Sequence, residues 1–313
     1  MLSVIIPARD VGPFVEAAVR SVLGQTLRDI EVLVVDDGSC DDTWERLCKF
    51  EDSRLRLLKG MGLGVSAARN QALAVARGPY VAFLDADDVW RLDHLERLSN
   101  RLDQEPEADL VFSALAWIDE GGSPLPRSVV RWDGRLGYEE LFLEFYPITT
   151  SSLCVRREAA LRVGGFDENL RSGTDHDFCL RIACLRPNNC AGAPEVGIDY
   201  RRRDGQITAN RMRKAEGWED LVRKHRTIEP EVVARLVGAA TANHQRALFA
   251  LAYEAGAFAE ARGWLAQALL AAPRTMVRDR RTWIAVAAAA ASLLPRSLRR
   301  TAENLGAKLL RGP

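Results

Sequence analysis

Short runs of apolar residues alternate with longer segments of helical periodicity in the first part of the chain. Continuous apolar runs predict strands at residues 2–7, 30–35, 54–58 and 80–84. Apolar residues spaced three or four apart predict helices at 13–25, 41–50 and 65–78. Strands that are apolar on both faces and that alternate with helices are typical of a parallel sheet covered by helices on both sides.

The pattern is less regular from residue 109 to about 200 and becomes helical after about 210. Further strands are predicted at 109–118 and 151–155, and a further helix at 176–184. Residues 246–273 have the spacing and the central glycine of a tetratricopeptide-type helical hairpin. Because one such hairpin cannot bury its apolar face alone, we predict a helical cap rather than a repeat array. We therefore expect an α/β domain over 1–210 and an α-helical region over 211–313.

Composition and charge change this picture only at the carboxyl-terminal end. The chain has 47% apolar and 27% charged residues and a formal net charge of zero, which gives no sign of a nucleic-acid partner. Residues 211–313, however, contain 18 Lys and Arg against 9 Asp and Glu, which indicates a second function or a surface that meets an anion such as a membrane. The last part, 296–313, has the pattern of a basic amphipathic helix, which either packs on the protein or contacts anionic lipid.

Three further features favour a cytoplasmic protein. The sequence MLSVIIPARD at the start lacks the basic segment and cleavage site of a secretory signal. The longest apolar run, Trp283–Leu294, is shorter than the roughly 20 residues of a membrane-spanning helix. Six cysteines include no C-x-x-C pair, which favours buried or free thiols in a reducing compartment. We expect any membrane contact to be peripheral, at the inner face of the cell membrane.

Polar residues follow three of the predicted strands, in the segments PARD (7–10), DDGS (36–39) and DADD (85–88). In sheets of this kind the ligand site lies beyond the carboxyl ends of the strands, so we expect the three segments at one edge. Asp36 and Asp37 are placed there to accept hydrogen bonds from a ribose or a base edge. Asp41 or Asp42 is expected to cap the helix that follows.

The segment MGLGVSAARN (61–70) places two glycines before a helix. It lacks G-x-G-x-x-G and does not follow the first strand, so Gly62 and Gly64 predict a loop and a helix start rather than a dinucleotide site. Arg69 lies just inside that helix, on the side of the predicted edge. It faces either a phosphate or base there, or solvent.

The segment FLDADDVW (83–90) crowds three carboxylates together, which repel one another unless a cation or proton relieves the charge. The spacing of Asp85 and Asp87 lets a turning backbone aim both at one centre. Oxygen ligands select hard cations such as Mg²⁺ or Mn²⁺, which typically join carboxylates to substrate phosphates. Asp88 is expected instead to serve the turn or to cap a helix that starts near Arg91.

A loop and a helix start lie in residues 164–183, GGFDENLRSGTDHDFCLRIA. Of the two acids Asp175 and Asp177, one is explained by the preference of helix N-termini for negative charge. The other, in a cleft opposite a metal site, would be a natural general base. His176 beside them is more simply incidental.

Together these segments resemble the family 2 glycosyltransferases of the GT-A fold. The resemblance is carried, in the family's order and over residues 2–210, by SVIIPARD, FVEAAVRSVLGQT, EVLVVDDGSCDDT, GVSAARNQALAVARGPYVAFLDADDVW, GGFDE and DHDFCLRIA. It implies a GT-A (Rossmann-like), mostly parallel sheet flanked by helices. It also implies inverting transfer of a sugar from a UDP- or GDP-linked donor to a glycan or lipid-linked acceptor, in cell-surface polysaccharide or glycolipid assembly.

The resemblance also assigns residues to roles. It implies that Asp37 holds the nucleotide base, beside the first-strand tip of Pro7, Ala8 and Arg9. It implies that Asp85 and Asp87 form the D-x-D motif, with Asp87 as the direct ligand of Mn²⁺ or Mg²⁺, and that Asp175 is the catalytic base. On the acceptor side it implies Gly165 and Phe166.

The chain departs from the family pattern at two positions. Thr174 stands where an acidic residue usually precedes the catalytic base, which affects acceptor contacts. Arg203 stands where many relatives carry a His that reaches the metal or diphosphate. Arginine cannot ligate a cation but can bind a diphosphate, so we expect Arg202 or Arg203 to close over the phosphates, with Asp204 a weaker candidate ligand.

Two other functions remain open at this point. A sugar-phosphate nucleotidyltransferase also uses a doubly wound sheet and paired Asp, but it would want a glycine-rich phosphate loop after the first strand, where PARDVGPF has one Gly. A non-catalytic protein that binds nucleotide sugars or docks through its helices would not need Asp87 and Asp175.

Overall fold

The computed structural model describes residues 1–295 apart from 127–128, 130, 145–147 and 204–209. The chain divides into two compact units. The first consists of Met1–Leu141 and Phe145–Gln206, and the second of Phe142–Glu144 and Ile207–Pro313.

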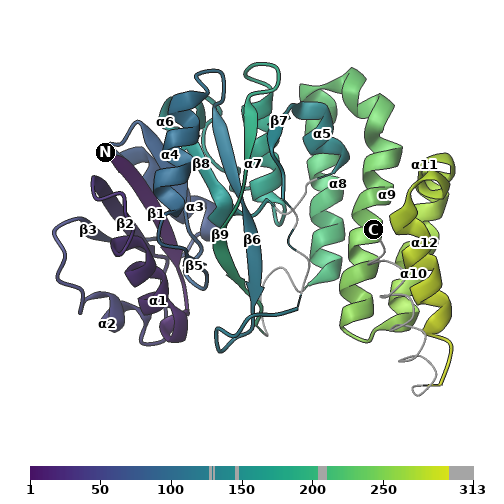
Figure 1. Cartoon of the computed structure of the whole chain (residues 1–313), viewed down its shortest axis with the longest axis horizontal. Coiled ribbons are helices and arrows are strands. Elements are labelled where there is room, and N and C mark those ends of the chain that lie inside the picture. Colours follow the sequence, from purple (N-terminus) through teal and green to yellow (C-terminus); the bar gives the residue numbers. More distant parts are fainter. Residues whose placement is uncertain (127–128, 130, 145–147, 204–209, 296–313) are drawn as a thin grey trace. The chain divides into compact units, whose positions relative to one another are not determined.

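The first unit is built on a nine-stranded sheet, with the order β3-β2-β1-β4-β8-β6-β9-β5 and with β7 paired to β9 (Figure 1). The strands are β1 (Leu2–Ala8), β2 (Ile30–Asp36), β3 (Leu55–Lys59), β4 (Tyr80–Phe83), β5 (Val89–Trp90), β6 (Leu110–Ile118), β7 (Gly134–Leu136), β8 (Leu153–Arg156) and β9 (Cys190–Arg201). The pairs β1–β2, β1–β4, β2–β3 and β6–β9 are parallel. The predicted mixed, mostly parallel sheet is therefore confirmed.

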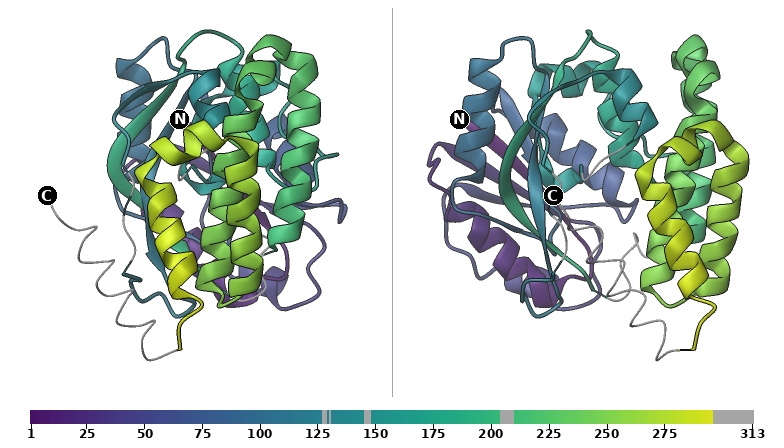
Figure 2. Two further views of the ribbon diagram at one scale, coloured as in Figure 1. Left: turned by 90° about the vertical axis from the view of Figure 1, so that its right-hand side faces the viewer. Right: turned by 45° about the vertical axis from the view of Figure 1, so that its right-hand side comes forward.

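Helices cover both faces of this sheet. They are α1 (Gly12–Leu23), α2 (Thr43–Leu47), α3 (Val65–Val75), α4 (His94–Gln104), α5 (Tyr138–Leu143), α6 (Arg157–Arg162) and α7 (Thr174–Ala183). Apolar side chains of α1 and α4 join alternate residues of β1 in one core, which includes Val15, Leu98 and Val4. The views in Figure 2 show α3 and α7 on the other side of the sheet.

Two predictions for this unit need correction. The predicted strand at 151–155 begins with a 3₁₀ turn, Thr150–Ser152, and becomes a strand only at Leu153. The long strand β9 was not predicted, because its sequence CAGAPEVGIDYR interrupts the apolar pattern with Gly, Pro and charged residues. Its register to β6 shifts between Ser113 and Leu115, which accommodates that irregular stretch.

The second unit is helical throughout its described residues. Its helices are α8 (Arg211–Ile228), α9 (Pro230–Glu254), α10 (Phe258–Ala271), α11 (Pro273–Arg278) and α12 (Arg280–Ala291). The predicted hairpin corresponds to the end of α9 and to α10, which meet at Gly256 with a positive φ of 73°. Glu144 accepts hydrogen bonds from Arg246 and Arg281, which fixes the short segment 142–144 to these helices. The predicted basic helix at 296–313 lies outside the described residues.

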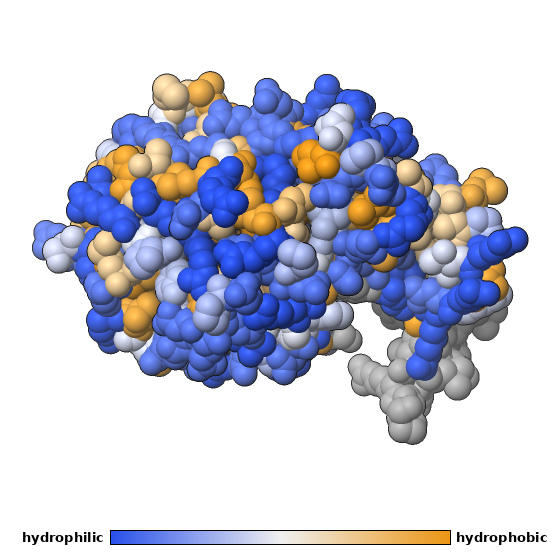
Figure 3. All heavy atoms as spheres, turned by 90° about the horizontal axis from the view of Figure 1, so that it is seen from above, coloured by the Kyte–Doolittle hydropathy of each residue, from blue (hydrophilic) through white to orange (hydrophobic). Residues whose placement is uncertain are grey.

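Two features of the described residues concern membrane contact: the length and apolar character of the helices, and the hydropathy of the surface. Among the described residues, no helix combines the length and the apolar character that a bilayer crossing requires. On the face drawn in Figure 3, hydrophilic residues dominate and apolar ones form small groups.

Candidate functional site

The carboxyl ends of three neighbouring parallel strands meet at one edge of the sheet. Ala8 at the end of β1 is in register with Asp36 at the end of β2, and Ile5 of β1 is in register with Phe83 of β4. The Asp37 amide donates to the Ala8 carbonyl at 2.8 Å. The predicted edge therefore exists, and the segments that follow these strands form its rim.

Asp37 holds a glycine-rich loop in place. Its carboxylate is buried, and its Oδ1 accepts hydrogen bonds from the backbone amides of Gly62 at 2.8 Å and Leu63 at 3.2 Å. Its Oδ2 accepts from the amide of Gly64 at 2.7 Å. An ionised carboxylate offers about four acceptor positions, so the loop uses most of them. The predicted loop and helix start at these glycines are confirmed, because α3 begins at Val65.

The other residues of this part of the rim are engaged more simply. Pro7 and Ala8 are buried within β1. Arg9 is half exposed, and its Nη1 lies 3.8 Å from Oδ2 of Asp37. Asp36 is buried and pairs with Nζ of Lys59 at 3.0 Å. Asp36 is therefore satisfied by the fold, while Arg9 reaches the rim.

Capping of α2 is partly as predicted. Asp42 occupies the N-cap position but makes no capping bond with its side chain. Asp41 accepts instead from the backbone amides of Thr43 at 3.0 Å and Gly12 at 2.9 Å, so it ties the start of α2 to the start of α1.

Asp85, just beyond β4, forms an ion pair with Arg69 of α3. The Nη2 of Arg69 lies 2.5 Å from Oδ1 of Asp85. The Arg69 side chain is only 4% exposed, so the alternative of a solvated arginine is wrong. Desolvation raises the pKa of the Asp85 carboxyl, Asp87 and Asp175 raise it further by repulsion, and Arg69 opposes them. These carboxylates are thus close enough to influence one another.

Asp87 pairs with an arginine that follows β9. The Nε of Arg203 donates to Oδ2 of Asp87 at 2.8 Å. The guanidinium carbon of Arg203 lies 5.3 Å from the centroid of the Phe14 ring. Arg201 donates from its Nε to the Asp87 carbonyl oxygen at 2.8 Å. Each carboxylate of the D-x-D motif is therefore paired with an arginine, Asp85 with Arg69 and Asp87 with Arg203.

Asp88 does not cap a helix near Arg91, because β5 intervenes and α4 begins only at His94. Its buried carboxylate accepts from the Ser151 hydroxyl at 2.6 Å and from the Arg201 amide at 2.9 Å. The same hydroxyl oxygen accepts from the Asp85 amide at 3.1 Å. Desolvation raises the pKa of Asp88 well above its usual range. Asp88 thus fixes the shape of the turn from inside the protein.

Asp175 lies in the first turn of α7, which Gly173 precedes with a positive φ of 72°. Asp175 is half-buried, and its Oδ1 accepts from the amide of His176 at 2.9 Å. Asp177 is fully buried and pairs with Arg181 at 2.7 Å, so it serves the fold. Nε2 of the buried His176 lies 2.9 Å from the Leu141 carbonyl oxygen, which agrees with a structural role. The hydrogen bond from the His176 amide orients the Asp175 carboxylate at the start of the helix.

Phe166, on the loop that is expected to border the acceptor side, has a buried ring. The ring is 2% exposed and its centroid lies 5.1 Å from that of Phe83 and 4.4 Å from that of Phe178. Phe83 precedes the D-x-D turn and Phe178 lies one turn after Asp175. The aromatic cluster of these three rings therefore fixes α7 relative to the end of β4.

Asn70 anchors the loop that contains Gly165 and Phe166. Its Nδ2 donates to the Phe166 carbonyl oxygen, and its Oδ1 accepts from the Phe166 amide, both at 2.8 Å. Gly165 has a positive φ of 70°, and a Cβ there would lie 2.3 Å from Oδ1 of Asn70. Sequence reasoning missed Asn70, although it follows Arg69 directly within the segment GVSAARN. Thr174 is the first residue of α7 and is half-buried.

The donor set of the rim fits a hard divalent cation. Within the described ranges, no three or more His, Cys, Asp or Glu side chains converge as a ready-made metal cage. Asp85 and Asp87 both present carboxylates that already attract cationic groups. A cation held by one or two carboxylates and completed by substrate phosphates is the arrangement that Mg²⁺ usually adopts. Asp204, the weaker candidate ligand, lies outside the described residues.

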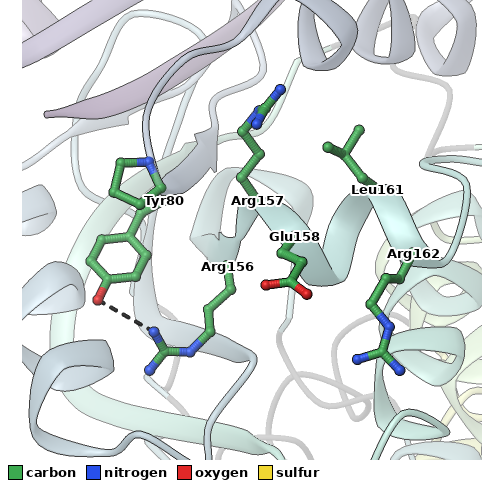
Figure 4. Close-up of a pocket in the computed structure, with 7 residues that line it drawn as sticks. Tyr80, Arg156, Arg157, Glu158, Leu161 and Arg162 are labelled. Atoms are coloured by element: carbon green, nitrogen blue, oxygen red, sulfur yellow. Dashed lines mark hydrogen bonds between the residues drawn. The ribbon is translucent and has the colours of Figure 1, made fainter.

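A hollow of about 580 Å³ lies elsewhere in this unit, around the beginning of β4 and α6. Figure 4 shows its lining side chains, which diverge rather than converge on one point. Arg156 donates from Nε to the Ala108 carbonyl and from Nη2 to the Leu102 carbonyl, both at 2.8 Å. This hollow is at the opposite end of β4 from Asp85, and its central arginine serves the fold.

The family model described as glycosyl transferase family 2 matches residues 3–163. The E. coli UDP-Glc:alpha-D-GlcNAc-diphosphoundecaprenol beta-1,3-glucosyltransferase WfaP is 44% identical over 91 residues. That match covers 29% of this chain and 36% of the E. coli enzyme, so the chain spans about a third of this relative's length.

Two groups of solved structures share the fold. The S. aureus TarS fragment 1–349 in complex with UDP-GlcNAc has a TM-score of 0.60 at 18% identity, covering 95% of this chain and 82% of that one. The Pyrobaculum calidifontis mannosyltransferase PcManGT in complex with GDP-Man and Mn²⁺ has a TM-score of 0.56 at 20% identity, covering 99% and 84%. The predicted GT-A fold, with its helical carboxyl-terminal region, is thereby confirmed.

Proposed function

Because the chain belongs to glycosyl transferase family 2, we propose that it moves a hexosyl or N-acetylhexosaminyl group from a UDP- or GDP-linked sugar to an acceptor hydroxyl, with inversion. The observation that carries the proposal is that Asp85 and Asp87 follow the end of β4, beside which the contact between the Phe83 and Phe178 rings holds α7, the helix that carries Asp175 in its first turn. Family membership also disfavours the nucleotidyltransferase and the non-catalytic alternatives.

The nucleotide base binds, in this proposal, beside the loop that Asp37 holds. Asp37 contributes mainly by fixing the amides of residues 62–64, with about one acceptor position left for the base. The strand tip of Pro7, Ala8 and Arg9 forms the neighbouring wall, and Arg9 is exposed enough to reach a ligand. Relatives of the fold bind UDP-GlcNAc or GDP-Man, which supports a nucleotide-sugar donor.

The diphosphate binds near Asp85 and Asp87. A bound Mn²⁺ or Mg²⁺ ion would supply charge stabilisation to the leaving diphosphate. Asp87, with Asp85 beside it, would hold this ion. Arg69 orients Asp85 through the 2.5 Å ion pair and is itself buried, so it acts on the donor through Asp85 rather than by direct contact.

Asp175 is the general base. It takes the proton of the acceptor hydroxyl as the hydroxyl oxygen forms a bond to the anomeric carbon of the donor sugar. The bond from that carbon to the diphosphate oxygen breaks in the same displacement, so the configuration inverts. Gly165 and Phe166 shape the acceptor side through the backbone that Asn70 holds, and Thr174 borders it at the start of α7. General-base assistance typically contributes about 10²–10⁴-fold to the rate.

The acceptor is a glycan or a lipid-linked sugar of cell-surface polysaccharide or glycolipid assembly. A relative that acts on a diphosphoundecaprenol-linked sugar supports this class. The basic segment 296–313 is proposed to contact anionic lipid at the inner face of the membrane, with the rest of the chain in the cytoplasm. Sedimentation with anionic vesicles should fall when 296–313 is deleted, and unchanged sedimentation would end that idea.

Screening nucleotide sugars tests the proposal. Each of UDP-glucose, UDP-GlcNAc, UDP-galactose and GDP-mannose is incubated with Mn²⁺, and the release of UDP or GDP is measured. We expect one donor to be hydrolysed slowly by the wild-type protein and far more slowly by Asp175→Asn. Hydrolysis of every donor at the rate of a protein-free control would contradict the proposal.

A further inference from the structure

Asp87, the carboxylate proposed to hold the metal, already has a cation beside it. Nε of Arg203 lies 2.8 Å from its Oδ2. The two side chains are only 15% and 22% exposed, so water screens the pair weakly. The position that many relatives fill with His thus places a permanent positive charge against the D-x-D motif.

The surrounding contacts show that this pair is built into the fold. The guanidinium carbons of Arg203 and Arg201 lie 5.3 and 5.2 Å from the centroid of the same Phe14 ring. Arg201 also donates to the carbonyl oxygens of Asp87 and Glu120, at 2.8 and 2.7 Å. The end of β9 is therefore fastened beside the D-x-D turn, and Arg203 reaches Asp87 from a fixed backbone.

Arg69 holds the other carboxylate of the motif differently. It is 4% exposed, and its guanidinium carbon lies 5.0 Å from the centroid of the buried Phe166 ring. Arg203 instead lies two residues beyond the end of β9, and its side chain is 22% exposed against 4% for Arg69. Of these two ion pairs, the one at Asp87 is the one that can exchange.

We propose that Arg203 and the divalent cation compete for Asp87, and that the nucleotide diphosphate relieves the competition by binding Arg203. This inference rests on the proposed function. Two cations on one carboxylate repel each other, so metal alone binds weakly. The pair uses the Nε–H of Arg203, and the four other N–H groups of a guanidinium suit phosphate oxygens. Metal and nucleotide therefore strengthen each other's binding.

The test measures Mn²⁺ binding without any sugar transfer. Free Mn²⁺ is titrated by electron paramagnetic resonance against the wild-type protein and Arg203→Gln, with and without UDP and GDP. Without nucleotide, we expect Arg203→Gln to bind Mn²⁺ about tenfold more tightly than the wild type, a typical size for coupled sites. With nucleotide present, the difference in Mn²⁺ affinity between Arg203→Gln and the wild type should shrink or reverse, because the variant has lost a diphosphate contact.

Two matched variants complete the design. Arg91→Gln removes the same charge four residues after Asp87 in the sequence, from a guanidinium whose Nη2 donates to Oδ1 of Asp199 at 2.9 Å, and should bind Mn²⁺ like the wild type. Arg203→Lys keeps the charge and should retain weak Mn²⁺ binding. Thermal melting checks that each variant is folded.

The outcomes separate this inference from the proposed function. Mn²⁺-dependent nucleotide binding by the wild type, together with unchanged or weaker Mn²⁺ binding by Arg203→Gln, overturns the competition alone. Equal gains in Mn²⁺ affinity for Arg203→Gln and Arg91→Gln also overturn it, because general charge would then be the cause. If neither nucleotide nor Mn²⁺ binds the wild type or Arg203→Gln, both this inference and the proposed donor site are wrong.

Discussion

Asp37 and Asp87 stand at the same rim but are satisfied in different ways. Asp37 accepts three hydrogen bonds from backbone amides of residues 62–64, which belong to the fold and cannot leave without unfolding the loop. Asp87 is paired with the side chain of Arg203, which we propose exchanges with a metal ion. A carboxylate bound by the backbone shapes a site, whereas one bound by a side chain can exchange its partner for a ligand.

Replacing Asp175, the proposed general base at the same rim, has the largest expected effect on activity. Asp175→Asn keeps the shape of the side chain but removes the base, so kcat should fall about 10²–10⁴-fold. Donor binding, measured by calorimetry with Mn²⁺ present, should remain near that of the wild type. Turnover at the wild-type rate would remove Asp175 from the mechanism.

Replacing Asp87 should weaken ligand binding more than it weakens the fold. In Asp87→Ala we expect at least about tenfold loss of nucleotide affinity in Mn²⁺, since a charge-assisted ligand contact is typically worth about 1.5–3 kcal/mol. Treating the wild type with EDTA should have the same direction of effect. Asp93→Ala, which removes an exposed pair with Arg97, is the control and should bind the nucleotide normally. An Asp87→Ala protein that still shows wild-type, Mn²⁺-dependent binding would break the comparison.

Asp37→Ala should weaken the fold more than Asp87→Ala does. Three backbone amides lose their acceptor, and a typical intramolecular hydrogen bond contributes about 0.5–1.5 kcal/mol, so urea unfolding should show a clear loss of stability. The amides of residues 62–64 should also exchange hydrogen faster. If Asp37→Ala is as stable as the wild type, the backbone contacts do not distinguish the two carboxylates.

The smallest of the expected effects concerns the acceptor side. Asn70→Ala removes two hydrogen bonds to the Phe166 backbone, so we expect the free energy of unfolding to fall by about 1–2 kcal/mol. We also expect the KM for the acceptor to increase more than the KM for the donor. Gln71→Ala removes one exposed contact to the Lys59 carbonyl and serves as the control. Equal changes in both KM values would place Asn70 in general support of the fold.

The regular part of the fold could be predicted from the sequence because its pattern is local. Strands β1, β2 and β3 are continuous apolar runs, and their predicted bounds agree with the structure to within one or two residues. The long strand β9 escaped prediction because it contains Pro194 and three charged residues and is stabilised by pairing with β6. Pairing across some 80 residues leaves no periodic signal in the sequence.

The site shows the same limit. The segments PARD, DDGS and DADD could be placed at one rim from the rule for parallel strands alone, whereas Asp175 was assigned to the site through the family resemblance. What the sequence could not give were the partners, because they come from distant segments: Ser151 and Arg201 for Asp88, and Asn70 for the loop at Phe166. The spacing in the sequence separates Asp88 from Asp85 and Asp87, and these partners show that Asp88 holds the turn from inside the protein.

The stereochemistry of the reaction tests the central claim most directly. With the donor found by screening, proton magnetic resonance follows the anomeric configuration of the first sugar product as it forms. A single displacement assisted by Asp175 predicts that an α-linked donor gives a β product. A product that retains the donor's configuration would contradict the account, because it would require a second displacement or a different attacking face.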